Sequence, residues 1–419
     1  MAEAPLKWPR LSAPWLNSPE LAKVFAALGS GGAKARVVGG AVRNALLDRP
    51  VHEVDIATTS PPEDTMRLAR DAGLGAHPTG IDHGTITIVS DGQSFEVTTL
   101  RRDVETDGRH AVVAFTNDWT EDASRRDFTI NALYCDLAGN IYDPVGGGLA
   151  DIRKRRVRFI GDAEARIRED YLRILRFFRF SAQYGNGQID PTGLAAAEAL
   201  KDGLILLSAE RVSAEMLKLL AAPGAPDVLG VMYDAGILQL AVRTQIEPDR
   251  FARLAGIEAA LGEPPDPITR LAALAVIHPG DDVFLANQLR LSNADAHRIA
   301  AALETDPGID PHTPESAGRA ALYRLGPETF RRAARLAWAR SGASPNSQTW
   351  RARALLPDRW NASKMPFSGS DVMALGVGQG VAVGRVLEAF ERWWIENDFP
   401  SDAEQQRKVL KDLAAKALA

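Results

Sequence analysis

The stretch that decides the fold reads ARVVGGAVRNALLDRPVHEVDIAT and spans residues 35–58. Two short apolar runs, at 35–38 and 51–57, predict strands, and the segment between them has the spacing of a short helix. Side chains alternate between the two faces of a strand, so Glu53 and Asp55 point the same way while their apolar neighbours point into the core. The stretch therefore predicts a strand–helix–strand unit that carries two carboxylates on one patch.

Two carboxylates this close repel each other unless a cation, an arginine or a proton neutralises them. Mg²⁺ takes oxygen ligands from one or two carboxylates and leaves its other positions to substrate phosphates, which is the arrangement of a phosphoryl-transfer site. The alternative is an exposed strand edge on which Glu53 and Asp55 are solvated. The pair alone does not choose between the two interpretations, so the surrounding sequence must.

A pair of glycines, Gly39 and Gly40, joins the first predicted strand to the predicted helix. Glycine lets the backbone N–H groups at the start of a helix come close to a phosphate, and Arg43 would lie within the first turn and reach the same anion. The alternative is a tight turn that holds no ligand. The position of the glycines just before the acidic strand favours the phosphate-binding interpretation.

The composition bounds the class of protein. The chain has 419 residues, of which 45% are apolar and 25% charged, so we expect a globular protein with roughly two to four domains. A single cysteine, Cys135, excludes an internal disulfide, and the absence of a long apolar run or a secretory leader predicts a cytoplasmic protein with no membrane contact. The net charge of -5 gives no overall attraction to nucleic acid, so any polyanion must bind a local patch.

Two further strands are predicted at 83–89 and 94–100, on either side of the turn-forming Asp-Gly pair at 91–92. Glu96 lies in the second of them and is either a third carboxylate at the metal or an outward-facing strand residue. Residues 101–115 mix acids and bases with no clear period and are expected to form a mobile loop.

Helical spacing returns at 120–133, where Arg125 and Arg126 would hang off the start of the helix. Adjacent arginines are unfavourable at that end of the helix dipole, so they need another explanation. They form either a surface ion-pair cluster with Asp122 or Asp127, or a clamp that binds the oxygens of a triphosphate.

A last predicted hairpin at 134–142 completes an α/β unit with a small mixed sheet. The sequence then becomes helical, and Asp162 is expected to cap a long helix that continues to about Tyr184. Asp170 and Arg173 are three residues apart and would share one face of this helix. They are either an ordinary ion pair or a reader of nucleobase edges, because Asp accepts from a base amino group and Arg donates to ring acceptors.

The second half of the chain, from residue 190 onward, has the pattern of amphipathic helices separated by Gly- and Pro-containing breaks at 222–226, 262–267, 278–281, 306–314 and 357–369. It contains no fixed repeat period. Six aromatic residues are at least as well explained by a hydrophobic core as by nucleotide stacking: Trp338, Trp350, Trp360, Phe367, Trp393 and Trp394.

Six motifs occur in one order along the chain: Gly39-Gly40-Ala41-Val42-Arg43, Glu53-Val54-Asp55-Ile56-Ala57-Thr58, His83-Gly84-Thr85, Glu96-Val97-Thr98-Thr99, Arg125-Arg126-Asp127-Phe128-Thr129-Ile130-Asn131-Ala132, and Glu169-Asp170 followed by Arg173. With them the chain resembles the bacterial CCA-adding tRNA nucleotidyltransferases and the closely related bacterial poly(A) polymerases. Both are class II members of the DNA polymerase β-like nucleotidyltransferase superfamily. The resemblance covers residues 33 to about 220.

This resemblance implies a fold and a division into domains. It implies an α/β polymerase β-like nucleotidyltransferase head with a small mixed sheet at 1–150. An all-α neck that selects the nucleobase would follow at 151–222, and an all-α body and tail that bind tRNA at 223–419. The nucleotide would lie between head and neck.

The resemblance also implies roles for the residues at the motif positions. The cofactor would be Mg²⁺, held by Glu53 and Asp55, with Glu96 as a weaker third ligand. The residues that would contact CTP or ATP are Gly39, Gly40, Arg43, Arg126, Asp127, Asp170, Arg173 and Arg176. Within this set Arg126 would join the metal ligands in catalysis, and Asp170 and Arg173 would form the amino-acid template that selects CTP or ATP. Arg211 and Glu215 resemble the motif that supports this template.

One residue departs from the family pattern, which has Asp where Glu53 stands. The extra methylene moves the carboxylate by on the order of an ångström, whereas Mg²⁺ requires near-ideal octahedral geometry. Our leading hypothesis is addition of CCA to tRNA 3′ ends, and the segment at 102–112 supports it because relatives that add only CC lack such a loop. One alternative is a poly(A) polymerase, and another is a tRNA-binding protein whose metal site has lapsed. The sequence leaves the oligomeric state open.

Overall fold

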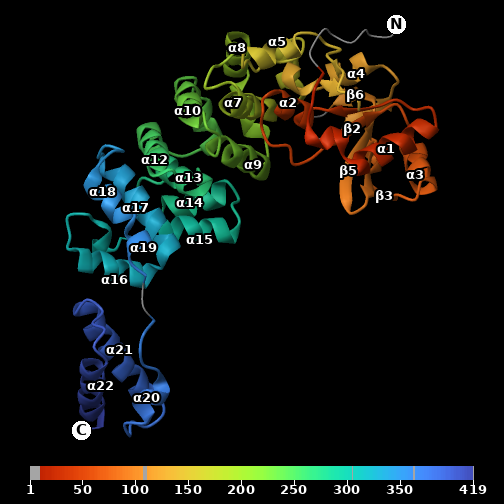
Figure 1. Cartoon of the computed structure of the whole chain (residues 1–419). Helices are drawn as coiled ribbons and strands as arrows, with labels where there is room; N and C mark the ends of the chain where they lie inside the picture. The colour runs from red at the N-terminus through yellow and green to blue at the C-terminus, as the bar shows by residue number, and fades with distance from the viewer. Residues whose placement is uncertain (1–9, 107–110, 304, 362–363, 419) are drawn as a thin grey trace. The chain divides into compact units, whose positions relative to one another are not determined.

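The computed structural model of the chain describes residues 10–106, 111–303, 305–361 and 364–418. Within these ranges it describes the side chains of all residues except 103–106 and 111–113. The chain divides into two compact units, Met1–Arg243 and Thr244–Ala419 (Figure 1). The predicted domain boundaries after residues 150 and 222 both fall inside the first unit and remain predictions.

The first unit is built on a mixed sheet whose described strands lie in the order β3-β4-β5-β2-β1-β8-β9. β2 and β5 pair in parallel, and the other neighbours pair antiparallel. The strands are β1 (Ala35–Val38), β2 (Asp55–Thr58), β3 (Gly75–Gly80), β4 (Thr85–Ser90), β5 (Gln93–Thr99), β8 (Tyr134–Cys135) and β9 (Ile141–Tyr142). The predicted mixed sheet is confirmed. The prediction missed β3 because its sequence, GAHPTG, lacks apolar alternation and contains glycine and proline.

The deciding stretch folds much as predicted. β1 pairs antiparallel with β2, and α2 (Gly40–Leu46) follows β1 directly. Val54 and Ile56 are buried as predicted, but Ala57 and Thr58 are buried too, so both faces of β2 are covered beyond Asp55. The second strand begins at Asp55 and not at residue 51, because the four residues of β1 offer no partner to the residues before it.

Helices α1 (Pro19–Ser30) and α3 (Pro62–Asp71) pack together and against the sheet. The Ser18 hydroxyl caps α1 as expected, by accepting from the N–H of Leu21 at 3.0 Å. The described part of the N-terminal arm, which includes η1 (Pro14–Asn17), also folds onto this unit, since the N–H of Leu11 donates to the carbonyl of Gly139 at 2.8 Å. Gly139 has a φ of 80°, and a Cβ there would lie 2.4 Å from the Leu11 carbonyl oxygen, so this close approach requires glycine.

Hairpins account for the next part of the chain. Asp91 and Gly92 both have positive φ, as a two-residue turn between β4 and β5 requires, and the predicted hairpin is confirmed. The expected mobile loop at 101–115 is wrong: β6 (Arg101–Thr106) and β7 (Ala111–Phe115) form a second hairpin, with 107–110 outside the described residues. The sequence signal was the Asp-Gly pair at 107–108, which the mixed charges on either side obscured.

The prediction of one helix at 120–133 is also wrong. α4 (Trp119–Ser124) ends before Arg125, and the chain then turns at 125–127, is extended at Phe128 and enters η3 (Thr129–Asn131). Phe128 is fully buried, and its ring packs against three other rings, those of Phe159, Phe177 and Phe180. Burial of this ring outweighs local helix propensity, so the two arginines follow a helix and do not begin one.

Helices complete the first unit: α5 (Gly148–Arg153), α6 (Ala163–Glu169), α7 (Leu172–Tyr184), α8 (Pro191–Ala199), α9 (Ala209–Leu220), α10 (Ala225–Asp234) and α11 (Ile237–Val242), with the short turns η2 (Ile81–His83) and η4 (Lys201–Leu206). Asp162 caps α6, but the long helix expected after it is broken between α6 and α7. Asp170 is extended at the break, with a φ of −158°, and its carboxylate accepts from the N–H of Leu172 at 3.1 Å. An aspartate that bonds the backbone two residues on favours a new helix start over continuation of the old helix.

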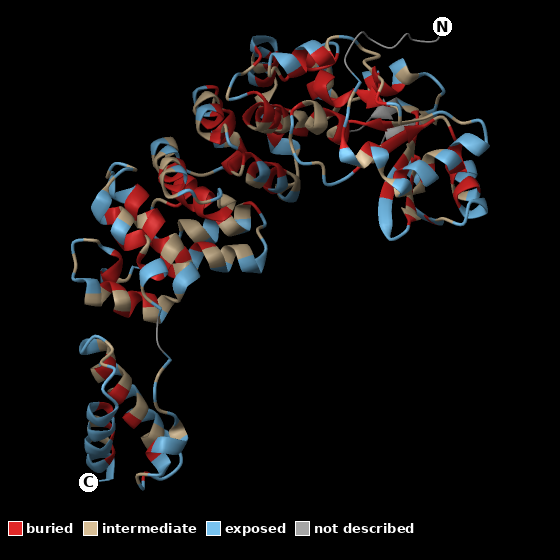
Figure 2. Ribbon diagram, in the orientation of Figure 1, coloured by how far each residue is buried: buried red, intermediate tan, exposed pale blue. Residues whose placement is uncertain are grey.

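The second unit is built from α12 (Pro248–Leu261), α13 (Pro267–Ala275), α14 (Asp281–Gln288), α15 (Asn293–Ala302), η5 (Pro307–Ile309), α16 (Glu315–Leu325), α17 (Pro327–Ser341), α18 (Gln348–Ala354), α19 (Leu356–Arg359), α20 (Gly369–Met373), α21 (Val381–Glu396) and α22 (Ala403–Leu418). Each predicted break coincides with a helix boundary. Trp338, Trp350 and Trp394 are buried, which supports the core interpretation of these aromatics, and buried residues gather on the packed faces of the helices (Figure 2). No helix of the described residues is long and apolar enough to cross a membrane.

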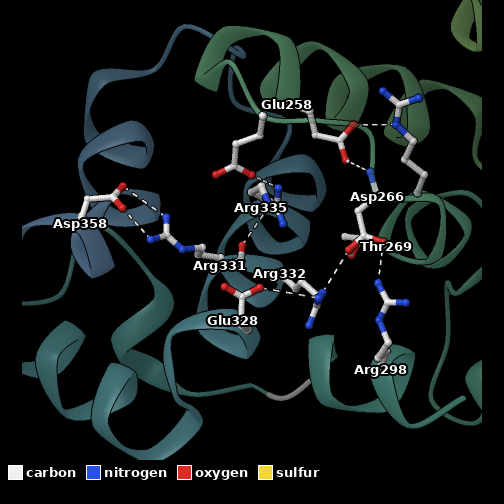
Figure 3. A network of polar contacts seen from close by, with 11 residues as sticks. Glu258, Asp266, Thr269, Arg298, Glu328, Arg331, Arg332, Arg335 and Asp358 are labelled. Carbon is white, nitrogen blue, oxygen red and sulfur yellow. Dashed lines mark hydrogen bonds and ion pairs between the residues drawn. The ribbon is translucent and has the colours of Figure 1, made fainter. Parts of the chain in front are cut away.

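A polar network fixes the connection between α12 and α13 (Figure 3). The Asp266 carboxylate caps α13 and accepts from Arg298 and Arg332, each at 3.1 Å. Glu258, which is buried, accepts from Arg270 at 2.6 Å and from the backbone N–H of Asp266 at 3.2 Å. The paired carboxylates hold the ends of these helices in place and belong to the architecture of the unit.

Candidate active site

A pocket of about 500 Å³ in the first unit gathers most of the residues that the sequence singled out. They come from the end of β1, the start of β2, the segment after α4, the α6–α7 junction and α9. The lining residues are Gly39, Gly40, Arg43, Asp55, Arg126, Asp127, Asn131, Asp170, Leu172, Arg173, Arg176, Phe180 and Arg211. All the predicted nucleotide contacts are therefore neighbours, although they lie up to 137 positions apart in the chain (from Gly39 to Arg176).

Asp55 is the carboxylate of this pocket whose charge is least compensated. Burial, and then the negative charges of Glu96 and Glu53, raise the pKa of the Asp55 carboxyl to about 6, against the opposing charge of Arg126. A single guanidinium therefore does not balance the acids that act on this position. A bound divalent cation would balance them, so the residues present fit a metal site.

The other two predicted metal ligands lie at the edge of this site. Glu53 is exposed in the segment before β2, and Glu96 is exposed on β5, the strand that pairs in parallel with β2. The described residues contain no group of three or more His, Cys, Asp or Glu side chains arranged to hold a metal ion. One or two carboxylates suffice for Mg²⁺ when substrate phosphates supply further ligands, so Glu53 remains a predicted ligand and Glu96 a predicted third one.

Gly39 and Gly40 form the turn from β1 into α2. Gly39 has a φ of 68°, a conformation that favours glycine, and a Cβ on it would lie 3.7 Å from Nη1 of Arg126. The turn thus brings backbone close to the guanidinium that lines the same pocket. This geometry agrees with the predicted close approach of a phosphate.

Arg43 is more constrained than a free anion ligand would be. It is 7% exposed, and it donates to Oδ1 of Asn131 at 2.5 Å and to the hydroxyl of Tyr184 at 2.7 Å. Burial lowers the pKa of its guanidinium. Arg43 therefore ties α2 to α7 and to the segment after α4, and it forms one wall of the pocket.

Arg126 is held from behind by a buried carboxylate. Its Nη2 donates to Oδ2 of Asp122 at 3.1 Å, while its Nε is buried without a hydrogen-bond partner among the described residues. Arg125 also donates to Asp122, through Nε at 2.9 Å and Nη2 at 2.7 Å. The predicted ion-pair cluster exists, but it is buried and not on the surface, and it leaves one edge of Arg126 to the pocket.

Asp127 is saturated with hydrogen bonds. Its Oδ1 accepts from the N–H of Phe128 and from Nδ2 of Asn131, and its Oδ2 accepts from Nε and Nη2 of Arg176 at 2.9 and 2.5 Å. Burial acts to raise the pKa of Asp127, but the Arg176 guanidinium and the hydrogen bonds hold it below its usual value. Asp127 therefore joins the head segment to α7 as a permanent anion.

Asp170 and Arg173 are neighbours in the pocket, but their strongest partners are other residues. Oδ2 of Asp170 accepts from Nη2 of Arg211 at 2.7 Å, and Arg173 bonds Glu169 and the carbonyl of Arg166. The expected i,i+3 arrangement on one helix face is wrong, because the helix breaks at Asp170. The break turns the Asp170 carboxylate toward α9, where Arg211 anchors it.

Sequence reasoning left four lining residues out of the predicted nucleotide contacts, and it missed the central place of Asp122. Asn131 lies within the Arg125–Ala132 motif, and Arg211 belongs to the motif that supports the template, so both carried a signal. Leu172 and Phe180 carried none, because an apolar residue in a pocket wall looks like any core residue. Asp122 was considered only as a surface partner of the arginines.

Comparisons with known proteins agree with the geometry. The family model for the poly A polymerase head domain matches residues 35–158. The chain is 34% identical over 392 residues to the mitochondrial CCA tRNA nucleotidyltransferase 1 of Danio rerio, covering 90% of this chain and 86% of the relative. It is 30% identical over 379 residues to the CCA-adding enzyme of Lactobacillus johnsonii, covering 89% and 92%.

A solved structure supports the same relationship. The Bacillus stearothermophilus CCA-adding enzyme in complex with CTP matches 97% of this chain and 99% of its own, with 29% identity and a TM-score of 0.71. The predicted fold class, a mixed-sheet head followed by a mostly helical remainder, is confirmed by this match. Because similarity to the full-length relatives extends across both units, the chain belongs to the family of CCA-adding tRNA nucleotidyltransferases, which is typically dependent on a divalent metal ion.

Proposed function

We propose that this protein adds C, C and A in turn to the 3′ ends of tRNA from CTP and ATP, without a nucleic-acid template. The observation that carries the proposal is the pocket in which Asp55, Arg126 and Asp170 meet. It combines a carboxylate fit for a metal ion, a guanidinium fit for phosphate and a carboxylate fit for a base amino group. Similarity across both units to CCA-adding enzymes supports the same activity.

Mg²⁺ is the proposed cofactor, with Asp55 and Glu53 as the residues that would hold it. When bound, it would supply the positive charge that stabilises the attacking oxygen, the leaving oxygen and the triphosphate. The raised pKa of Asp55 supports this assignment, because burial, and then the charges of Glu96 and Glu53, disfavour the ionised carboxylate and a bound cation would favour it.

The triphosphate would be bound chiefly by Arg126 and the glycine turn. Arg126 lines the pocket, and a guanidinium binds phosphate oxygens through paired N–H donors. In the reaction, the 3′-hydroxyl oxygen of the tRNA forms a bond to the α-phosphorus while the bond from that phosphorus to pyrophosphate breaks. The chain's own contribution is to align these groups and to balance their charge.

The choice of nucleotide would fall to Asp170 and Arg173. Cytosine and adenine each carry an exocyclic amino group that can donate to the Asp170 carboxylate, whereas uracil and guanine present a carbonyl oxygen there. Arg211 supports this role by fixing the orientation of that carboxylate, and Glu169 does the same for Arg173.

Two other activities are compatible with parts of the site. The poly(A) polymerase alternative shares the head domain, since the family model that matches residues 35–158 is described as the poly A polymerase head domain. The other alternative, a tRNA-binding protein whose metal site has lapsed, rests on Glu53, which replaces the Asp of the family pattern. The two predict different products from the same tRNA.

The experiment that tests the proposal follows incorporation of labelled CTP and ATP, separately and together, into tRNA transcripts that end before CCA, after C and after CC, with Mg²⁺ present. We expect addition of two C and one A, after which the reaction stops. Continued addition of A without use of CTP would establish the poly(A) alternative. No incorporation alongside measurable tRNA binding would establish the binding protein.

A matched variant tests the departure at the metal site. Glu53→Asp restores the family pattern and shortens the side chain by one methylene. If Glu53 holds the ion, this change should shift the Mg²⁺ concentration that gives half-maximal rate. An unchanged Mg²⁺ dependence would remove Glu53 from the ligand set.

A further inference from the structure

We propose that Asp122 is a positioning residue that holds the Arg126 guanidinium in place at the wall of the nucleotide pocket. The inference rests on the proposed function, because it concerns the triphosphate and metal steps of that reaction. Asp122 does not line the pocket, and the sequence predicted for it only a surface ion pair with the arginines.

The Asp122 carboxylate is a buried hub with 1% of its side chain exposed. Oδ1 accepts from the Arg125 guanidinium and from the backbone N–H of Arg101 at 3.3 Å, and Oδ2 accepts from Arg126 and from the Tyr134 hydroxyl at 2.7 Å. A carboxylate with four lone-pair directions is saturated by these donors. Its position is therefore set from several directions at once, which makes it a rigid anchor.

Arg126 is the link between this anchor and the pocket. Arg126 and Asp55 both line the pocket, whereas Asp122 does not. Nη2 of Arg126 is bonded to Asp122, and its Nε is left over without a described partner. The buried anion behind Arg126 thus competes with the acids in front of it for the same guanidinium.

The outcome of this competition decides what the pocket can bind. A guanidinium that moved to Asp55 would neutralise the carboxylate that a divalent cation needs, and it would turn its donors away from a phosphate. Because Asp122 retains Arg126, Asp55 stays free for the cation and the guanidinium stays at the pocket wall, where a triphosphate can bind it. Asp122 acts through Arg126 and touches neither ligand itself.

Support from the backbone makes the same side chain easier to hold. Nη2 of Arg166, in α6, donates to the carbonyl oxygens of both Arg125 and Arg126, the latter at 2.8 Å. The backbone of Arg126 is thereby fixed from the neck side and its side chain from the head side. The backbone contacts do not fix the direction of the guanidinium. Asp122 sets that direction through its bond to Nη2.

The test is Asp122→Asn, which keeps the shape and removes the charge. We expect the KM for CTP and for ATP to rise together by about tenfold, because the triphosphate is common to both. The Mg²⁺ concentration for half-maximal rate should rise as well, by about threefold or more, since Arg126 then competes for Asp55. Discrimination against UTP and GTP should not change, because Asp170 and Arg173 are untouched.

Two control variants separate positioning from a general loss of stability. Tyr134→Phe removes a hydrogen bond from the same Asp122 oxygen and an interaction with Arg126, but it keeps the Asp122 charge, so both KM values should rise less than in Asp122→Asn. Glu258→Gln removes a buried ion pair in the second unit, where Glu258 meets Arg270, and should lower the melting temperature without changing either KM.

The inference is overturned if Asp122→Asn, folded by its melting curve, keeps the wild-type KM and Mg²⁺ dependence. It is also overturned if the changes only match those of Glu258→Gln. Should Asp122→Asn not fold, Asp122→Glu keeps the charge and displaces the carboxylate by about 1 Å, and the same rise in both KM values is expected. Calorimetric binding of CTP to the protein alone, with Mg²⁺ and without tRNA, separates a failure of this inference from a failure of the proposed function.

Discussion

Asp55 and Asp122 are two aspartates that both interact with Arg126, and they differ in the sign of their pKa shift. Asp55 has a pKa raised to about 6, by burial and by Glu96 and Glu53. For Asp122, burial acts in the same direction, but Arg126, Arg125 and the Tyr134 hydroxyl overcome it and hold the pKa at about 2. Burial is thus common to both, and the number of donors decides the outcome.

A carboxylate paired with arginines, as Asp122 is, also occurs in the second unit. In the second unit, Asp266 accepts from Thr269 and two arginines, and its pKa lies below the usual value although burial acts to raise it (Figure 3). Asp266, which caps a helix, therefore has guanidinium partners of its own. Asp55 shares the guanidinium of Arg126, which Asp122 already binds, and this difference marks Asp55 as a residue kept for a ligand.

The strongest way to break the comparison is Asp55→Asn. If Asp55 is kept for a catalytic metal ion, this variant should lower the rate of CTP and ATP incorporation by about 1,000-fold or more. Binding of tRNA, measured by filter retention, should remain close to wild type because the fold is intact. Substantial residual incorporation would show that the metal ligand has been assigned to the wrong carboxylate.

The second test compares the effect of the two aspartates on stability. The folded pKa of Asp122 lies below its unfolded value, so its stabilising contribution is present above about pH 4 and is lost as the pH falls toward 2. Asp122→Asn should therefore lower the free energy of unfolding by about 2 kcal/mol at pH 7, and much less near pH 2.

Asp55 should behave in the opposite way in metal-free protein. Its folded pKa lies above its unfolded value, so ionisation costs stability as the pH rises from about 4 through 6. Asp55→Asn should then raise the free energy of unfolding at pH 7 by about 1 kcal/mol, and urea titrations of both variants would measure the contrast. Equal signs for the two variants would contradict the comparison.

A third test uses the pH dependence of the metal requirement. Protons and the divalent cation compete for Asp55, so the Mg²⁺ concentration for half-maximal incorporation should rise by about tenfold per pH unit below about pH 6. Incorporation assays across a Mg²⁺ series at pH 5, 6 and 7 would measure it. A requirement independent of pH over this range would mean that Asp55 does not hold the ion.

The smallest expected effect belongs to Asp170, a pocket carboxylate that accepts from one arginine, Arg211, and from the N–H of Leu172. Asp170→Ala should reduce the preference for CTP over UTP by about tenfold, since it removes the proposed acceptor for the base amino group. Competition between labelled nucleotides on one tRNA transcript gives the ratio. If the ratio is unchanged, Asp170 serves only to anchor Arg211.

Much of the head could be predicted from local sequence. The run at 35–38, the glycine pair after it and the alternation around Asp55 specify their own strands and turn, because burial with period two and the freedom of glycine are local properties. The breaks between helices of the second unit were likewise marked by glycine and proline. The nature of the predicted site residues followed from the order of the motifs.

The tertiary structure decided what those residues bind. Phe128 leaves a helical pattern to enter a ring cluster, and Asp170 breaks a helix to meet Arg211, because partners distant in sequence outweigh local propensity. The choice of Arg126 between Asp122 and Asp55 is likewise invisible in the sequence, where all three are simply charged. The sequence by itself determined which chemical groups the pocket would contain. Only the fold determined which of them are paired and which are left for a ligand, because pairing depends on burial and on distance in three dimensions.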